Sequence, residues 1–200
     1  NASVRDARRR GPEMAGQERD IAILFADLRS FTLFAEKKLP YDVVFVLNRY
    51  FANMGEAVEA SGGHLDKFIG DGVMALFGTK TDIRRGAREA MDAARKMATN
   101  LADLNEQLKD ELEAPLRMGI GIHVGPAIIG EMGYGTATGL TAIGDSVNTA
   151  SRLEAMTKEF DAQLIVSEDV TTAAEAPVNT YEECEIEVRG RDEAVKVYVI

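Results

Sequence analysis

Two aspartates stand where predicted strands end, and their carboxylates suit a divalent metal ion. Asp27 follows the apolar run Ile21–Ala26, and Asp71 lies in the turn Gly70-Asp71-Gly72 between two strand-like segments. Carboxylate oxygens are preferred protein ligands of Mg²⁺ and Mn²⁺, which take their other ligands from water and phosphate. Each aspartate alone can equally be an ordinary turn former. If their strands are neighbours, the two carboxylates can meet at one edge of a sheet and hold metal.

The residues after Asp27 can bind phosphate. Ser30, Phe31 and Thr32 follow the strand at the expected start of a helix, where consecutive backbone N–H groups can face an anion. A helix N-cap is the ordinary alternative for Ser30 or Thr32.

A second polar pair stands on a predicted helix, Val147–Glu159. Asn148 and Arg152 are four residues apart and therefore project from one helical face. The planar guanidinium of Arg152 suits charge on phosphate oxygens. Alternatively, Arg152 forms an exposed ion pair and Asn148 is a first-turn residue.

The elements that must position these residues alternate in type. Helix Tyr41–Glu59 has apolar residues at spacings of three and four, and Gly70-Asp71-Gly72 suits a hairpin. The order β-α-β-β-α-β with additions predicts an α+β, ferredoxin-like split βαβ fold, with a mixed sheet and helices mainly on one face. The remaining expected elements are strands His64–Ile69, Val73–Phe77, Leu116–Val124, Ala127–Met132, Leu164–Ser167, Cys184–Val188 and Val195–Val199, and helix Ile83–Leu108.

Composition excludes several classes of protein. The net charge of −10 argues against a binder of nucleic acid, which needs a basic face. The single cysteine, Cys184, excludes an internal disulfide, and His64 and His123 have no second ligand at metal-site spacing. No apolar run is long enough for a membrane span, and no signal-peptide pattern appears. We expect a cytoplasmic domain, whose parent protein can still be membrane-tethered with this domain on the cytosolic side.

The basic opening, with Arg5 and Arg8 to Arg10 before Gly11-Pro12, predicts a linker over residues 1–19 and one domain over 20–200. We interpret the chain as a piece of a longer protein with a fused regulatory or sensor domain. A frayed natural terminus is the alternative.

Three segments resemble signatures of one enzyme family. Phe25–Thr32, Lys67–Gly72 and Gly144–Arg152 are similar, in order, to the signature segments of class III adenylyl and guanylyl cyclases. The likeness extends from about Asp20 to the C-terminus. It implies an enzyme that converts ATP into cyclic AMP and pyrophosphate.

The resemblance also implies roles for residues. Asp27 and Asp71 match the aspartates that bind two Mg²⁺ or Mn²⁺ ions per active site, and Leu28 adds a backbone carbonyl. Asn148 and Arg152 match the pair that stabilises the transition state. Ser30, Phe31, Thr32, Arg189 and Arg191 are the expected triphosphate contacts.

The base-selecting positions of the family match Lys67 and Thr141, with Ala142 beside them. Lysine there implies ATP, whereas guanylyl cyclases carry glutamate. Thr141 stands where aspartate is usual, which resembles the threonine-bearing, class IIIb-like subgroup. A hydroxyl both accepts and donates hydrogen bonds, so Thr141 alone discriminates weakly between bases. Without the resemblance, Lys67 is equally a solvated strand residue.

In this family one subunit supplies the metal aspartates and the other supplies the base-reading and transition-state residues. The chain carries both sets, which implies a homodimer with two equivalent sites. Three alternatives stay open: a guanylyl or dual-specificity cyclase, a diguanylate cyclase and a non-catalytic nucleotide-binding or dimerisation module. A diguanylate cyclase is expected to have a Gly-Gly-(Asp or Glu)-Glu-Phe hairpin, which Ile69–Gly72 does not match.

Overall fold

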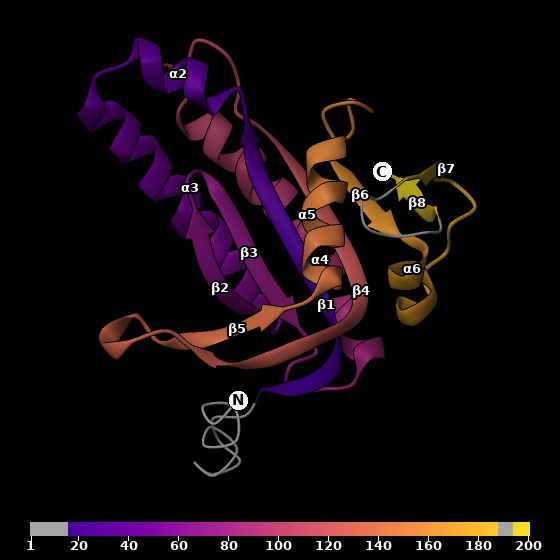
Figure 1. Cartoon of the computed structure of the whole chain (residues 1–200). Coiled ribbons are helices and arrows are strands. Elements are labelled where there is room, and N and C mark those ends of the chain that lie inside the picture. The colour runs from indigo at the N-terminus through magenta and orange to yellow at the C-terminus, as the bar shows by residue number, and fades with distance from the viewer. Residues whose placement is uncertain (1–15, 188–193) are drawn as a thin grey trace.

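A computed structural model describes residues 16–187 and 194–200, which form one mixed sheet with helices on its faces (Figure 1). The elements, in chain order, are β1 (Gln17–Arg29), α2 (Phe31–Lys37), α3 (Pro40–Ala60), β2 (His64–Ile69), β3 (Gly72–Phe77), α4 (Ile83–Gln107), β4 (Arg117–Met132), a 3₁₀ turn (Gly135–Ala137), β5 (Gly139–Ile143), α5 (Asp145–Met156), β6 (Leu164–Ser167), α6 (Glu168–Ala174), β7 (Glu182–Ile186) and β8 (Val195–Val199).

The sheet runs in the order β2-β3-β1-β4-β6-β8-β7, and β5 pairs with β4 outside this path. β1 is antiparallel to both β3 and β4, whereas β4 and β6 are parallel. The expected α+β fold with a mixed sheet is therefore confirmed. β5 and the C-terminal part of β4 form a two-stranded arm that extends away from the sheet (Figure 1).

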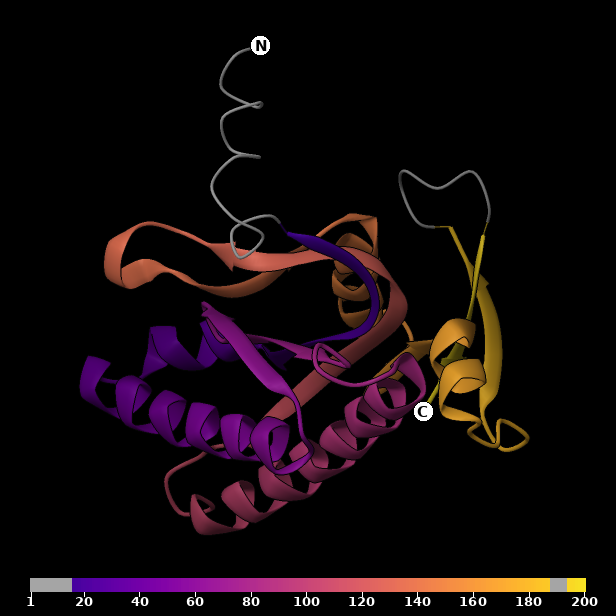
Figure 2. The ribbon, with the colours of Figure 1, turned by 90° about the horizontal axis from the view of Figure 1, so that it is seen from below.

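Strand β1 divides its side chains between two cores, as alternation along a strand requires. Ala22, Leu24 and Ala26 face a large core with α3, α4 and α6. Ile21 and Ile23 face the opposite core, to which α5 contributes Ala150. Figure 2 shows α3 and α4 side by side beneath the sheet. The helices therefore lie mainly on one face, as expected, with α5 on the other.

Helix α5 lies unusually close to β4 because β4 has glycine beneath it. A Cβ atom on Gly121 would lie 2.2 Å from the Glu154 backbone nitrogen and 2.6 Å from the Ala150 carbonyl oxygen. Any larger residue at position 121 must therefore displace the helix backbone. Since α5 carries Asn148 and Arg152, this contact sets their distance from the sheet.

Several boundaries differ from the sequence expectation. β1 begins at Gln17, so the last residues assigned to the linker pair with β4, and residues 1–15 lie outside the described residues. β4 is one continuous strand rather than two, because Gly125 and Pro126 stay in register with Ile21 and Asp20 of β1. Helix α2 begins at Phe31, where a helix start was expected, but its extent was not predicted, and helix α6 was not expected, since seven residues are too few to show a helical period.

Candidate active site

The two candidate metal aspartates meet at one end of the sheet. Asp27 lies near the end of β1, and Asp71 lies in the turn that joins β2 to β3. The neighbouring pair Ala26 and Val73 aligns the two strands, so the turn stands beside Asp27. Both carboxylates line a cavity of about 540 Å³. The neighbouring strands therefore bring the two carboxylates together at one edge of the sheet, as expected from the sequence.

The electrostatics of this cavity favour a cation. Burial, and then the neighbouring Asp71 carboxylate, raise the pKa of Asp27 to about 6. Oδ1 of Asp27 is buried without a hydrogen-bond partner. A buried carboxylate oxygen beside a second carboxylate is costly unless a cation is present. The pair therefore fits a divalent metal ion.

Such an ion would need further ligands from outside the chain. Among residues 16–187 and 194–200, no cluster of three or more His, Cys, Asp or Glu side chains has the arrangement of a metal site. Mg²⁺ commonly uses one or two carboxylates and completes its shell with water and phosphate oxygens. Two carboxylates in an open cavity match that pattern.

The turn from β1 into α2 lines the same cavity. Leu28, Ser30, Phe31 and Thr32 all contribute to its wall. Ser30 adopts a left-handed backbone conformation with φ of 58°, which turns the chain sharply from strand to helix. The phosphate-contact residues expected from the sequence therefore lie beside the aspartate pair.

Three cationic side chains also line this cavity, those of Arg29, Arg117 and Lys158. The Lys158 ammonium opposes the rise in the pKa of Asp27. Lys158 was missed from the sequence, because it reaches the cavity only through the turn after α5. Arg189 and Arg191, the expected triphosphate cations, lie outside the described residues.

Glu154 was also missed. It projects from α5 towards the sheet, and burial, followed by the charge of Asp27, raises its pKa to about 7. Its Oε1 atom is buried without a hydrogen-bond partner. A third acidic group therefore lies within electrostatic reach of the aspartate pair.

The base-selecting candidates form a separate cluster. Lys67 on β2 donates a hydrogen bond from Nζ to Thr141 Oγ1 on β5 over 3.2 Å. Ala142 is nearly buried, and its side chain belongs to the core on the α5 face of the sheet. Only the backbone of Ala142 is therefore available to a ligand.

Asn148 and Arg152 lie one turn apart on the exposed face of α5, while Leu153 packs against the sheet. Neither residue lines the aspartate cavity. The structure thus brings the metal and phosphate candidates together at the aspartate cavity and pairs Lys67 with Thr141 elsewhere. Within one chain, Asn148 and Arg152 belong to neither of these two groups.

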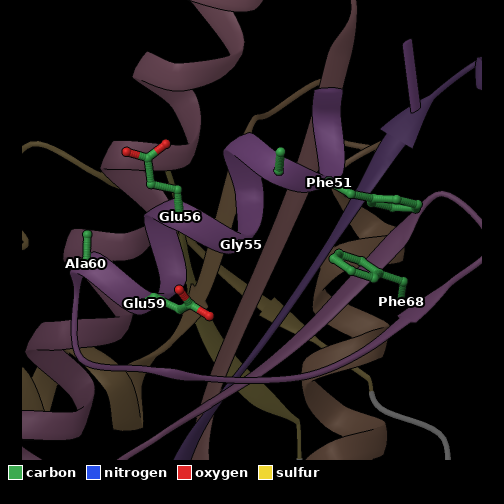
Figure 3. Close-up of a pocket in the computed structure, with 7 residues that line it drawn as sticks. Phe51, Gly55, Glu56, Glu59, Ala60 and Phe68 are labelled. Atoms are coloured by element: carbon green, nitrogen blue, oxygen red, sulfur yellow. The ribbon is translucent and has the colours of Figure 1, made fainter. Parts of the chain in front are cut away.

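A second hollow, between α3 and β2, is distinct from the aspartate cavity. It has a volume of about 610 Å³, and its aromatic wall is the stacked pair Phe51 and Phe68, with ring centroids 4.0 Å apart (Figure 3). Glu56 and Glu59 of α3 also line it. These acidic side chains disfavour a phosphate group, and no predicted site residue lines this hollow.

Comparison with known proteins assigns the family. A profile of the adenylate and guanylate cyclase catalytic domain matches residues 14–200. The chain belongs to this family. No helix in the described part of this cyclase-family chain is both long and apolar enough to cross a bilayer.

Relatives of this cyclase domain include enzymes of known name. It is 34% identical over 194 residues to an adenylate cyclase of Anabaena cylindrica, covering 93% of the chain and 38% of that relative. It is 30% identical over 186 residues to adenylate cyclase 1 of Rhizobium meliloti (strain 1021), covering 93% of the chain and 28% of that protein. The chain therefore spans less than half the length of these curated relatives.

Solved structures agree with the fold. The guanylyl cyclase Cya2 superimposes with a TM-score of 0.84 at 32% identity, covering 93% of both chains. The adenylyl cyclase CyaB from P. aeruginosa gives a TM-score of 0.81 at 26% identity, covering 93% of this cyclase domain and 95% of that chain.

Proposed function

We propose that this domain is an adenylyl cyclase, which converts ATP into cyclic AMP and pyrophosphate. The ribose 3′-hydroxyl would attack the α-phosphate in line and displace pyrophosphate. The observation that carries the proposal is the meeting of Asp27 and Asp71 at a cavity with one buried, unpartnered carboxylate oxygen. The named adenylate cyclases among the relatives support it.

The aspartate pair would hold two Mg²⁺ or Mn²⁺ ions, with the Leu28 carbonyl as a further ligand. When bound, such ions supply Lewis-acid stabilisation of phosphate charge and activation of the attacking hydroxyl. Ser30, Phe31 and Thr32 would contact the triphosphate beside them, together with Arg189 and Arg191.

The remaining roles belong to the other residues of the site. Lys67, Thr141 and the Ala142 backbone would bind the adenine base. Asn148 and Arg152 would stabilise charge that develops on the phosphate oxygens in the transition state, where a fixed guanidinium is most effective.

We further propose that the active unit is a homodimer whose two sites lie at the subunit interface. Within one chain, Lys67, Thr141 and Arg152 do not line the aspartate cavity, which supports a site that a second copy would complete. Large apolar side chains are also exposed; Tyr41 at the start of α3 is 87% exposed and Tyr134 on the β4–β5 arm is 93% exposed. Such side chains are available for burial against a second copy.

A guanylyl cyclase is the second candidate, because the likeness to Cya2 is as extensive as that to the adenylyl cyclases. The ammonium of Lys67 argues against it, since it offers donors and no acceptor to a guanine N–H. Because the chain covers 38% or less of these relatives, we also propose a fused regulatory domain in the parent protein. We propose a cytoplasmic location as well, because ATP is available there.

The test is product analysis. Purified protein is incubated with ATP or GTP in Mn²⁺ and in Mg²⁺, beside Asp27→Ala, Asp71→Ala and the control Asp110→Ala, which changes an exposed aspartate outside the cavity. The proposal expects cyclic AMP from wild type and control, and at least a hundredfold less from the two cavity variants, as for lost electrostatic stabilisation. Cyclic GMP as the main product would support the second candidate instead. Absence of any cyclic product at high protein concentration would refute both.

A further inference from the structure

A buried carboxylate that no motif identifies lies behind the base-selecting pair. Asp66 immediately precedes Lys67 on β2, and only 3% of its side chain is exposed. Its Oδ2 accepts a hydrogen bond from Thr141 Oγ1 over 2.5 Å, and its Oδ1 lies 3.5 Å from Lys67 Nζ. Lys67 in turn donates to Thr141 over 3.2 Å. The three side chains therefore form a closed triangle.

The backbone of β2 makes this triangle possible. Adjacent residues of a regular strand point to opposite faces of the sheet. The pairing of β2 with β3 shifts register between Leu65 and Lys67, which leaves Asp66 as the extra residue of a β-bulge. A bulge re-aims a side chain. Here it allows Asp66 and Lys67 to approach Thr141 from the same side.

The triangle determines the direction of the Thr141 hydroxyl. A hydroxyl has one proton to donate and two lone pairs to accept with. An ionised carboxylate can only accept, so the proton of Thr141 is directed to Asp66. One lone pair of the hydroxyl oxygen then accepts the hydrogen bond from Lys67, and the second remains as an acceptor for a ligand.

Lys67 contributes the opposite polarity. Its ammonium has three N–H donors; one is given to Thr141, and Asp66 is an ion-pair partner at 3.5 Å, which leaves at least one N–H for a ligand. The cluster thus presents one donor and one acceptor side by side. The Watson–Crick edge of adenine, with an acceptor at N1 and an amino donor at position 6, complements this pattern. A 6-oxopurine, with an acceptor at O6 and a donor at N1, has the reverse.

We propose that Asp66 is a specificity-determining positioning residue, which holds the Thr141 hydroxyl as an acceptor and so selects 6-aminopurine over 6-oxopurine nucleotides. The proposal rests on the proposed function of this site in binding the nucleotide base. Asp66 acts through Thr141 and need not touch the substrate. Without Asp66, the hydroxyl is free to rotate and donate to O6, and the discrimination falls.

The test compares ATP with inosine triphosphate, which differs from ATP at the 6-position and N1 of the base. The ratio of kcat/KM for the two substrates is measured with Mn²⁺ for wild type, Asp66→Ala, Thr141→Val and the double variant. We expect the ATP preference of wild type to fall about 10- to 100-fold in Asp66→Ala, as for loss of a charge-assisted hydrogen bond. A purely structural role would lower both rates equally and leave the ratio unchanged.

The double variant is the decisive control. If Asp66 acts through the hydroxyl, Asp66→Ala changes the ratio in wild type but has no further effect in the Thr141→Val background. An equal effect in both backgrounds, or an unchanged ratio in Asp66→Ala, overturns the proposal. Should Asp66→Ala not fold, the near-isosteric Asp66→Asn is measured instead. Asp66→Asn replaces the acceptor-only carboxylate with an amide, so the kcat/KM ratio of ATP to inosine triphosphate is again expected to fall. An unchanged ratio would overturn the proposal.

The outcome is separable from that of the proposed function. Equilibrium binding of 3′-deoxy-ATP and 3′-deoxy-inosine triphosphate, which lack the attacking hydroxyl, gives a ratio of dissociation constants that reports base preference without turnover. Cyclic AMP formation by wild type, with unchanged binding and kinetic ratios in the Asp66 variants, refutes only the role of Asp66. Absence of any cyclic product refutes the proposed function, while the binding ratios still support or overturn the role of Asp66.

Discussion

The carboxyl groups of Asp27 and Asp71 face one cavity from two different strand ends, and burial, followed by the Asp71 carboxylate, raises the pKa of Asp27. Burial leaves Oδ1 of Asp27 without a hydrogen-bond partner, so the chain alone does not satisfy this group. An arrangement that costs stability in the free protein is expected where a ligand later compensates it. The pair thus connects the fold to the proposed chemistry.

Metal binding should stabilise the protein through this pair. We expect Mn²⁺ at a hundred times its dissociation constant to add about 2.7 kcal/mol to the free energy of unfolding at pH 7.5. Asp27→Asn should lose most of this gain, whereas Asp110→Asn, at an exposed position, should retain it. Denaturant unfolding with and without Mn²⁺ measures the gain. Equal gains in the two variants would exclude Asp27 as a ligand.

The metal-free protein should respond to pH through Asp27. Its pKa is raised from 3.8 to about 6, so the folded state holds this proton more tightly than the unfolded state. The stability associated with protonated Asp27 is therefore present below about pH 4 and lost as the pH rises through about 6. Relative to Asp27→Asn, wild type should lose about 1–2 kcal/mol across this window, after allowance for solvent screening.

The measurement is the free energy of unfolding of both proteins in chelator at pH 4 and pH 8. Using the difference between two proteins cancels the contributions of carboxylates that Asp27 does not influence, such as Asp161, whose pKa is lowered by Arg117. Glu154 does not cancel, because burial and then the charge of Asp27 raise its pKa, so the measured difference includes this coupling. A difference that does not change with pH would show that Asp27 ionises freely.

Arg29 should matter for stability far more than Arg117, although both bind Asp161. The Arg29 side chain is 11% exposed and donates to the carbonyls of Thr157 and Ala162, which ties the end of β1 to the turn after α5. Arg29→Met should cost about 2–3 kcal/mol, because it removes the Arg29 donor from the Ala162 carbonyl and leaves the Thr157 carbonyl with the Ala162 N–H alone.

Arg117→Met is the matched control, because its side chain is 60% exposed and its ion pair spans 2.5 Å at the surface. It should cost less than about 1 kcal/mol. Urea unfolding of the two variants gives the comparison. Similar costs would mean that the carbonyl contacts of Arg29 contribute little.

Gly121→Ala should displace α5, since the new Cβ meets helix backbone rather than a flexible side chain. Overpacking of this kind costs about 1–3 kcal/mol. Because α5 carries Arg152, cyclic AMP formation should fall even where the variant remains folded. Gly139→Ala, whose Cβ meets nothing within 4 Å, is the control and should be nearly neutral. Equal activity of both variants at a temperature where both are folded would contradict this account.

Local sequence pattern was sufficient for the elements that carry the motifs. The hairpin around Asp71 was predicted because turn residues separate two apolar runs, and β6 has the expected bounds, Leu164–Ser167. The Gly125-Pro126 dipeptide was misleading, because tertiary pairing with β1 overrides its tendency to end a strand.

The missed site residues depend on contacts that no local pattern contains. Asp66 and Thr141 are 75 residues apart in sequence, and the bulge that brings them together shows no signature in the alternation of β2. Lys158 and Glu154 approach Asp27 only because α5 crosses the sheet above it. Such neighbours could be found only once the packing of α5 was known.

Mixing two inactive variants tests whether the proposed adenylyl cyclase sites are shared between two subunits. Asp27→Ala should abolish cyclic AMP formation through the metal site, and Arg152→Ala should abolish it through the transition-state site. A heterodimer of the two would contain one site with both defects and one site with neither.

We expect each variant alone to be inactive and an equimolar mixture, after subunit exchange, to recover about a quarter of wild-type activity. This follows from random pairing, in which half of the dimers are mixed and each has one intact site. A mixture that stays inactive, although differently tagged subunits are shown to co-purify, would contradict the shared site.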